Sequence, residues 1–314
     1  MKLWIGGAVA TMLVGLPCAA AAQDKDSEWT GVYVGVEAGG ASSRQRTTTT
    51  DNINQLSNIA VPGRGLVVVP ATSTSASGGD GKTSLVYGGL IGVLWESRGV
   101  IFGIEGDVHG PRNFSGFSSG PVAIPSTILA PGSTGTIGRD ARMSYDWSVR
   151  VKLGAVVAPK TMLYVSGGLA GARLRLTGQD SFTTPAGAAP TSGNIAAFVS
   201  PTIGPVVIAA SQRRNVLGWT AGLGGETKLS KSVGIGLDAR YTDYGTHDFT
   251  LAAGCNVATV AAGTCAGATR TAPAITINNV LLNPATDVTP GMVPGTTRAG
   301  FRDIRLTARL VFHF

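Results

Sequence analysis

The sequence has few of the patterns that soluble helical proteins contain. Helix-favouring runs of Leu, Glu and Lys are scarce, whereas Gly, Ser and Thr are abundant. After residue 22, no segment approaches the roughly 20 consecutive apolar residues that a membrane-spanning helix needs. Basic residues outnumber acidic ones, but they are scattered and form no cluster that would favour nucleic acid. A chain of this composition that enters a membrane must do so with strands.

Cysteine is also scarce. Apart from Cys18, the only cysteines are Cys255 and Cys265, which lie close together in one polar segment. We predict that they form a disulfide in an oxidising compartment, where it would restrain part of a long loop.

The one long apolar run of the chain lies at its N-terminus. Lys2 precedes an apolar stretch from Leu3 to Leu16, and Pro17 and a small-residue stretch ending at Ala22 follow. This order predicts a secretory signal peptide over residues 1–22, cleaved after Ala22. A membrane anchor is the alternative, but the run is short for one. Loss of Lys2 lowers the formal charge from +7 to +6, and residues 23–28 form an N-terminal segment.

The remaining chain is dominated by alternation of apolar and polar residues. This period of two is typical of strands with one apolar face. Eight segments show it: about 29–42, 84–96, 100–109, 145–157, 161–176, 216–229, 233–244 and 304–314. In the last segment, for example, Ile304 and Leu306 alternate with Arg305 and Thr307.

Short and long connections between these segments also alternate. Tight turns are predicted at 97–99, 159–160 and 230–232, and long loops at about 43–83, 110–144, 177–215 and 245–300. Outer-membrane β-barrels have this asymmetry, with the tight turns on the periplasmic side. We therefore predict an all-β fold over residues 29–314: an eight-stranded antiparallel transmembrane β-barrel with short periplasmic turns and four long extracellular loops.

The polar faces of the predicted strands carry acidic and basic residues in equal number. They are Glu37, Glu105, Asp107, Glu226, Asp238 and Asp303, and Arg150, Lys152, Lys228, Arg240, Arg305 and Arg309. A Lys or Arg facing lipid at mid-bilayer costs about 2–4 kcal/mol, so we expect these residues to face the lumen. Eight strands enclose a space that side chains can fill. The charges then form an ion-pair network that plugs the lumen, or, as the alternative, they line an ion path.

Two groups on the apolar faces carry further expectations. Phe314, Phe312 and Leu310 are predicted to face lipid, and such a C-terminal stripe is typical of the signal that the barrel assembly machinery recognises. If alternation continues, Arg173 and Arg175 face outward and meet lipopolysaccharide phosphates, which the arginine fork suits. A bulge would turn them into the lumen, and both interpretations stay open.

Several segments resemble a known family. WTGVYVGVEAG at 29–39, FGIEGD at 102–107 and GWTAGLGGE at 218–226 are similar to the repeated blocks of alphaproteobacterial outer-membrane immunogenic proteins, which are porin-family or opacity-like small barrels. So are the blocks at 146–154, 163–170 and 238–245. The resemblance covers all eight predicted strands and none of the loops. It implies the barrel fold and an outer-membrane location, and it leaves the ligands of the loops open.

Because some small outer-membrane barrels are enzymes, the candidate catalytic residues matter. His109 and His247 are predicted at the outer rim, and His247 lies near Asp243, Thr246 and Asp248. Loops rich in Ser and Thr bring such residues together by chance, and no His-x-Ser pair lies on a strand. No Cys and His cluster has metal-ligand spacing, and GGDGKT at 78–83 lacks the first glycine of a phosphate loop and a following helix. We expect no catalytic, cofactor or metal site, and hence no enzyme.

The resulting hypothesis is a monomeric barrel with a structural and surface-interaction role in the cell envelope. Its expected partners are outer-membrane lipid, lipopolysaccharide, the assembly machinery, and host or surface ligands that contact the loops. The alternative is a narrow channel for small solutes. A third hypothesis is a receptor whose loops bind a ligand such as haem.

Overall fold

The computed structural model describes residues 29–54, 59–61, 65–67, 72–123, 134–184, 203–251, 268–271, 275–277, 280–282 and 291–314. The predicted signal peptide, the segment 23–28 and the cysteine pair Cys255 and Cys265 lie outside the described residues. Across the described ranges, no helix combines the length and the hydropathy needed to cross a bilayer.

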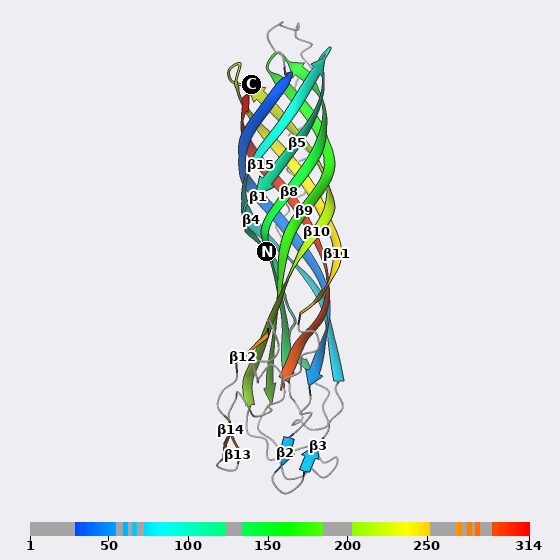
Figure 1. The fold of residues 1–314 in the computed structure, drawn as a ribbon, viewed down its shortest axis with the longest axis vertical. Helices are drawn as coiled ribbons and strands as arrows, with labels where there is room; N and C mark the ends of the chain where they lie inside the picture. Colours follow the sequence, from blue (N-terminus) through cyan, green and yellow to red (C-terminus); the bar gives the residue numbers. More distant parts are fainter. Residues whose placement is uncertain are drawn as a thin grey trace.

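Eight long strands pair antiparallel, each with its two neighbours, and close into a ring (Figure 1). In ring order they are β1 (Gly31–Asn54), β4 (Thr72–Ser97), β5 (Val100–His109), β8 (Thr134–Ala158), β9 (Thr161–Thr184), β10 (Ile203–Lys228), β11 (Val233–Thr250) and β15 (Gly291–His313). The last strand pairs with both β11 and β1, which closes the sheet. The predicted eight-stranded antiparallel barrel is confirmed.

Within the described ranges, seven short strands accompany the ring. They are β2 (Ile59–Val61), β3 (Gly65–Val67), β6 (Arg112–Ser118), β7 (Val122–Ala123), β12 (Ala268–Thr271), β13 (Ile275–Ile277) and β14 (Val280–Leu282). β6 and β7 continue the course of β5 and pair with β8, and β12 pairs with β10.

The tight turns lie together at one end of the barrel, near the C-terminus (Figure 1). Between β4 and β5, Arg98 and Gly99 have φ values of 53° and 81°. Two successive residues in the left-handed region make the two-residue hairpin turn whose twist matches that of the strands. This end faces the periplasm, as in other outer-membrane barrels.

A belt of exposed apolar side chains surrounds the half of the barrel next to the tight turns. On β15, for example, it runs from Ile304 to Phe314. Ten residues of tilted strand rise about 25 Å, the height of the apolar band that such barrels present to lipid. Aromatic rings border the belt: Trp95, Phe102, Phe312 and Phe314 near the turns, and Tyr87, Tyr145, Trp219 and Tyr241 on the opposite side. The belt and its aromatic borders locate the membrane.

Beyond the belt the strands continue much further than predicted. β1 reaches Asn54 and β9 reaches Thr184, and thus much of the four predicted loops is strand. In this extension the outward positions of β1 are polar and exposed, such as Arg44 and Thr48, while inward Thr47 and Thr49 are buried. Because both faces are polar here, the apolar-polar alternation that identifies membrane strands in a sequence is missing. This explains why the predicted strands are shorter than the observed ones.

The extension is no longer a closed ring but two facing sheets. Pairing between β10 and β11 stops at Trp219 and Asp243, and β4 pairs with β5 only from Gly88 onward. Away from the membrane, β15, β1 and β4 therefore lie on one side, and β8, β9, β10 and β12 on the other, below the narrow waist in Figure 1.

An aromatic core fills the space where the ring gives way to the two sheets. The ring of Phe301 packs edge-on against Phe114 and Phe249, with centroid distances of 5.4 and 6.1 Å. Tyr244 contacts Phe114, and Leu174 and other buried aliphatic side chains complete the cluster. All these side chains are buried, so the lumen is closed by apolar packing at this level.

The location of the belt predicts that outward substitutions on β15 should affect stability differently inside and outside the belt. Leu306→Arg, within the belt, should lower the free energy of unfolding by about 2–4 kcal/mol because it exposes a charge to hydrocarbon. Thr296→Arg lies on the same face of β15 but in the extension, and should change it by less than about 0.5 kcal/mol. Urea unfolding in lipid vesicles measures both, and equal effects would contradict the location of the membrane.

Candidate functional site

The candidate site is the charged lumen of the membrane-spanning barrel. All twelve lumen charges expected from the sequence are buried: Glu37, Glu105, Asp107, Arg150, Lys152, Glu226, Lys228, Asp238, Arg240, Asp303, Arg305 and Arg309. They come from six of the eight ring strands, because alternation places every second residue of each strand inward.

Glu105 of β5 is the centre of this network. Its carboxylate accepts hydrogen bonds from Arg150 and Lys152 of β8 and from Arg309 of β15. The Tyr33 hydroxyl donates a further bond of 2.7 Å to the same carboxylate. Since these side chains are fully or almost fully buried, one carboxylate neutralises cations that reach it from different sides of the barrel.

A second acid, Asp238 of β11, pairs with two of these cations, Arg150 and Arg309, and with Arg240. It lies 3.3 Å from Arg150 and 3.2 Å from Arg240, and it accepts a 2.9 Å hydrogen bond from the Tyr164 hydroxyl. Arg309 in turn donates to the Tyr164 oxygen over 2.7 Å. Buried charges are tolerated only when paired and hydrogen-bonded, and Arg150, Arg240 and Arg309 each have at least one carboxylate partner.

Towards the extracellular side, the network includes residues that the sequence did not single out. Arg112 of β6 bridges Asp146 and Asp303 over 2.9 and 2.8 Å, and Arg305 contacts the same two acids. The prediction that His109 lies at the solvated outer rim is wrong. It is 2% exposed and its ring bonds to Glu37, because β5 ends with His109 on its inward side.

At the periplasmic end, the lumen is closed by another group of contacts. His313 bonds to Glu226 over 2.6 Å, and the Trp29 ring packs edge-on against His313 at 5.6 Å. The Lys228 ammonium lies 4.7 Å from the centre of the Trp29 ring, within the range of a cation–π interaction.

The other predicted positions lie on the outer surface. Phe314, Phe312 and Leu310 are exposed on the lipid-facing side of β15. Arg173 and Arg175 are exposed as well, and alternation in β9 is unbroken between them and outward Leu169. Of the two interpretations left open by the sequence, the lumen-facing one is therefore wrong.

The residues near His247 do not form a relay. The His247 ring bonds to the backbone oxygen of Tyr244 at 2.7 Å, whereas Asp243 pairs with Arg302 over 3.0 Å. Asp248 is exposed and lies 4.0 Å from Arg298. In the part of the chain that the structure describes, no three His, Cys, Asp or Glu side chains are grouped as a metal site would need.

A separate buried ion cluster lies in the extension, outside the membrane. Arg139 donates to Asp180 over 2.7 Å and also bonds to Asp51, so two acids share one guanidinium. One carboxylate oxygen of each acid, Oδ2, is buried without a hydrogen-bond partner. Burial, together with the nearby Asp51 carboxylate, raises the pKa of Asp180 to about 7, although Arg139 opposes the shift.

The comparison with known proteins agrees with this architecture. Residues 8–263 match the family model described as an outer membrane protein β-barrel domain. No curated protein sequence matches the chain.

Solved structures with a similar course of the chain are distant. The outer membrane protease OmpT from Escherichia coli shares 10% identity over 90% of this chain and 97% of its own, with a TM-score of 0.37. Ail, the attachment invasion locus protein of Yersinia pestis, shares 10% identity over 89% and 99%, with a TM-score of 0.26. OprG from Pseudomonas aeruginosa shares 10% over 93% and 100%, with a TM-score of 0.25. Likenesses this distant carry no argument about function.

The expectation that the chain is not an enzyme needs correction. Structures of this type include a protease, so the barrel fold gives no ground for excluding catalysis. The physical reason is that a rigid barrel can hold catalytic side chains on the loops at its rim, whatever fills its lumen.

The network around Glu105 predicts a large effect of one isosteric substitution. Glu105→Gln removes the shared anion and leaves Arg150, Lys152 and Arg309 in excess, which should lower the free energy of unfolding by about 3–5 kcal/mol. Asp243→Asn breaks a partly exposed ion pair and should cost no more than about 1 kcal/mol. Urea unfolding followed by tryptophan fluorescence measures both, and similar losses would contradict the central role of Glu105.

The raised pKa of Asp180 predicts a dependence on pH. The folded protein retains a proton on Asp180 that the unfolded chain loses near pH 4, so stability of the extension should fall as pH rises from about 4 to about 7 and then level off. Asp180→Asn, which stays neutral, should remove this fall, whereas exposed Asp140→Asn should keep it. Hydrogen exchange of the β9 amides at several pH values measures the stability of the extension. An unchanged profile in Asp180→Asn would disprove the assignment.

Proposed function

Because the chain belongs to the outer-membrane β-barrel family and resides in the outer membrane, we propose that it is a closed barrel with a structural and surface-presenting role in the envelope. The blocks at 29–39, 102–107 and 218–226 support a place among the opacity-like small barrels of alphaproteobacteria.

The observation that carries this proposal is the paired state of the lumen. Arg150 of β8 pairs both with Glu105 of the neighbouring β5 and with Asp238 of β11, three strands away around the ring, and all three side chains are fully buried. An ion in transit would have to displace cations from their carboxylates, and removing a partner from a buried ion pair costs several kcal/mol. This favours the closed barrel over the narrow channel.

A second closure supports the same conclusion. The aromatic core of Phe114, Phe249 and Phe301 lies between the charged network and the extracellular end, and it is fully buried. A solute would have to open both an ion-pair layer and a close-packed apolar layer. The two layers have different chemistry, so no single change of salt or pH would open both.

The surface-presenting part of the proposal follows from the extension. β1, β8, β9 and β10 each have 24 to 26 residues, more than twice the 9–11 that a tilted strand needs to cross the bilayer. The additional length raises the loop ends of the strands above the membrane, where loops can meet surface ligands. A barrel that only spans the membrane would not need strands of this length.

The proposal predicts the absence of conductance. The refolded full chain in a planar lipid bilayer should show no stable current steps, while a porin in the same bilayer should conduct. Slower migration on a denaturing gel after heating would show that the barrel was folded. Stable steps in the wild type that Arg150→Glu abolishes would contradict the closed barrel, because Arg150 lies in the middle of the lumen.

A further inference from the structure

The outer surface of the extension carries a row of three arginines on neighbouring strands. Arg142 of β8 is directly opposite Arg175 of β9, and Arg175 is directly opposite Arg213 of β10. Paired positions share a face of the sheet, and all three residues are exposed. We call these residues the arginine row.

The arginine row lacks the ion-pair partners that two exposed arginines of β15 have. Arg298 and Arg302 of β15 pair with aspartates, but no carboxylate among the described residues forms an ion pair with a member of the row. Arg175 donates only to the hydroxyl of Ser211, over 3.1 Å. Like charges directly opposite one another destabilise a sheet. An external anion would relieve this repulsion.

The height of the row above the membrane indicates which anion it meets. Tyr145, on the aromatic border of the apolar belt, is directly opposite Arg173. Arg175 is the next outward residue of β9, roughly 7 Å further along the strand. Headgroup phosphates lie just outside an aromatic border, and the forked guanidinium binds phosphate oxygens in pairs.

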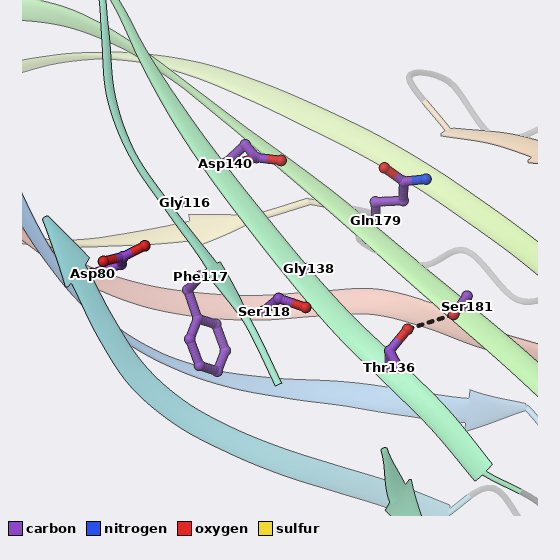
Figure 2. A pocket seen from close by; sticks show the side chains of 9 residues that line it. All are labelled: Asp80, Gly116, Phe117, Ser118, Thr136, Gly138, Asp140, Gln179 and Ser181. Atoms are coloured by element: carbon purple, nitrogen blue, oxygen red, sulfur yellow. Dashed lines mark hydrogen bonds between the residues drawn. The ribbon is translucent and has the colours of Figure 1, made fainter. Parts of the chain in front are cut away.

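A polar groove of about 410 Å³ adjoins the row on the side away from the membrane. Its floor is formed by β6, β8 and β9, and the Phe117 ring lies between Asp80 of β4 and the side chains of β8 and β9 (Figure 2). Asp140, two residues before Arg142 on the same face of β8, borders the groove. One ligand can therefore contact both features.

Glycine shapes this groove. A Cβ atom at Gly78 would lie 2.1 Å from the Phe117 ring, so only glycine at this position lets the ring lie against β4. A Cβ atom at Gly116 would similarly lie 2.5 Å from a carboxylate oxygen of Asp140. The absence of these side chains lets the Phe117 ring pack against β4 and leaves the Asp140 carboxylate open beside Gly116.

The chemistry of the groove suits a sugar. Asp80, Asp140 and the Gln179 amide offer acceptors and a donor for hydroxyl groups, and Ser118 adds a hydroxyl. The Phe117 ring offers an apolar face for the carbon-bound hydrogens of a sugar ring. Carboxylates in the groove disfavour phosphate there, so the phosphate of a mixed ligand is directed to the arginine row.

From this arrangement we propose that β6, β8, β9 and β10 bind the headgroup of a phosphorylated glycolipid of the outer leaflet, of the lipopolysaccharide class. Its phosphate lies on Arg142, Arg175 and Arg213, and its inner sugars lie in the groove over Phe117. The site is on the outside of the barrel and does not depend on whether the lumen conducts, so it goes beyond the proposed function.

The test uses the folded full chain in detergent micelles at low ionic strength, titrated calorimetrically with rough lipopolysaccharide. The triple variant Arg142→Gln, Arg175→Gln and Arg213→Gln should bind it at least about tenfold more weakly, because it loses charge-assisted bonds to phosphate. The control variant Arg44→Gln, Arg46→Gln and Arg298→Gln removes as many exposed arginines from β1 and β15 and should bind as the wild type does. Equal weakening in both would overturn the site.

A second pair of measurements separates the sugar from the phosphate. Asp80→Asn combined with Gln179→Ala changes two exposed groove residues and should weaken binding of lipopolysaccharide but not of lipid A, which lacks the core sugars. If this double variant binds lipopolysaccharide and lipid A as tightly as the wild type does, the groove is not the sugar site. Phosphatidylglycerol vesicles that bind as tightly as lipopolysaccharide would show adhesion to any phosphate and would also overturn the proposal. All variants should keep the closed lumen in the conductance measurement, so a conducting wild type would affect only the proposed function.

Discussion

The structure depends on one electrostatic constraint: charges inside a barrel too narrow for bulk water must neutralise one another. Glu105 and Asp238 satisfy this constraint for cations of other strands, including Arg150 and Arg309. Because each partner comes from a different strand, the contacts exist in only one register of the sheet. A slip of one residue would turn a whole row of charges toward lipid. The network thus specifies strand alignment as well as closing the lumen.

The same strands then meet a different solvent, and their outer face changes accordingly. On β15, Ile304 faces lipid whereas Arg302, two residues earlier, is exposed and paired with Asp243. The inward face changes in the same region from an ion-pair network to the aromatic core around Phe301. Once lipid no longer surrounds the ring, open sheet edges are tolerated, and the barrel divides into two sheets packed on that core.

Much of the membrane-spanning part could be predicted from the sequence because lipid imposes a simple rule on it. Val149 and Val151 must face outward, so Arg150 between them faces the lumen. The lumen partners of such residues were harder to predict. His109 and Asp146 lie at the ends of apolar patterns, and Arg112 lies in a segment taken for a loop. Only the three-dimensional register brings these residues together.

The extension was missed for a related reason. Thr47 and Thr48 alternate between buried and exposed positions, yet they are chemically identical. No pattern of hydropathy can distinguish such a strand from a polar loop. The arginine row is hidden in the same way, since Arg142, Arg175 and Arg213 are far apart in sequence and adjacent only across the sheet. In the sequence, each of these residues is indistinguishable from any other solvent-exposed arginine.

The length of the strands also determines what the cell exposes to its surroundings. About twelve residues of β1 beyond the belt add roughly 40 Å of strand, so Asn54 and Thr72 stand well away from the lipid. The strand ends are therefore well separated from the ion pairs that hold the barrel together. The extension thus acts as a spacer between the membrane-embedded ring and the ends of its strands.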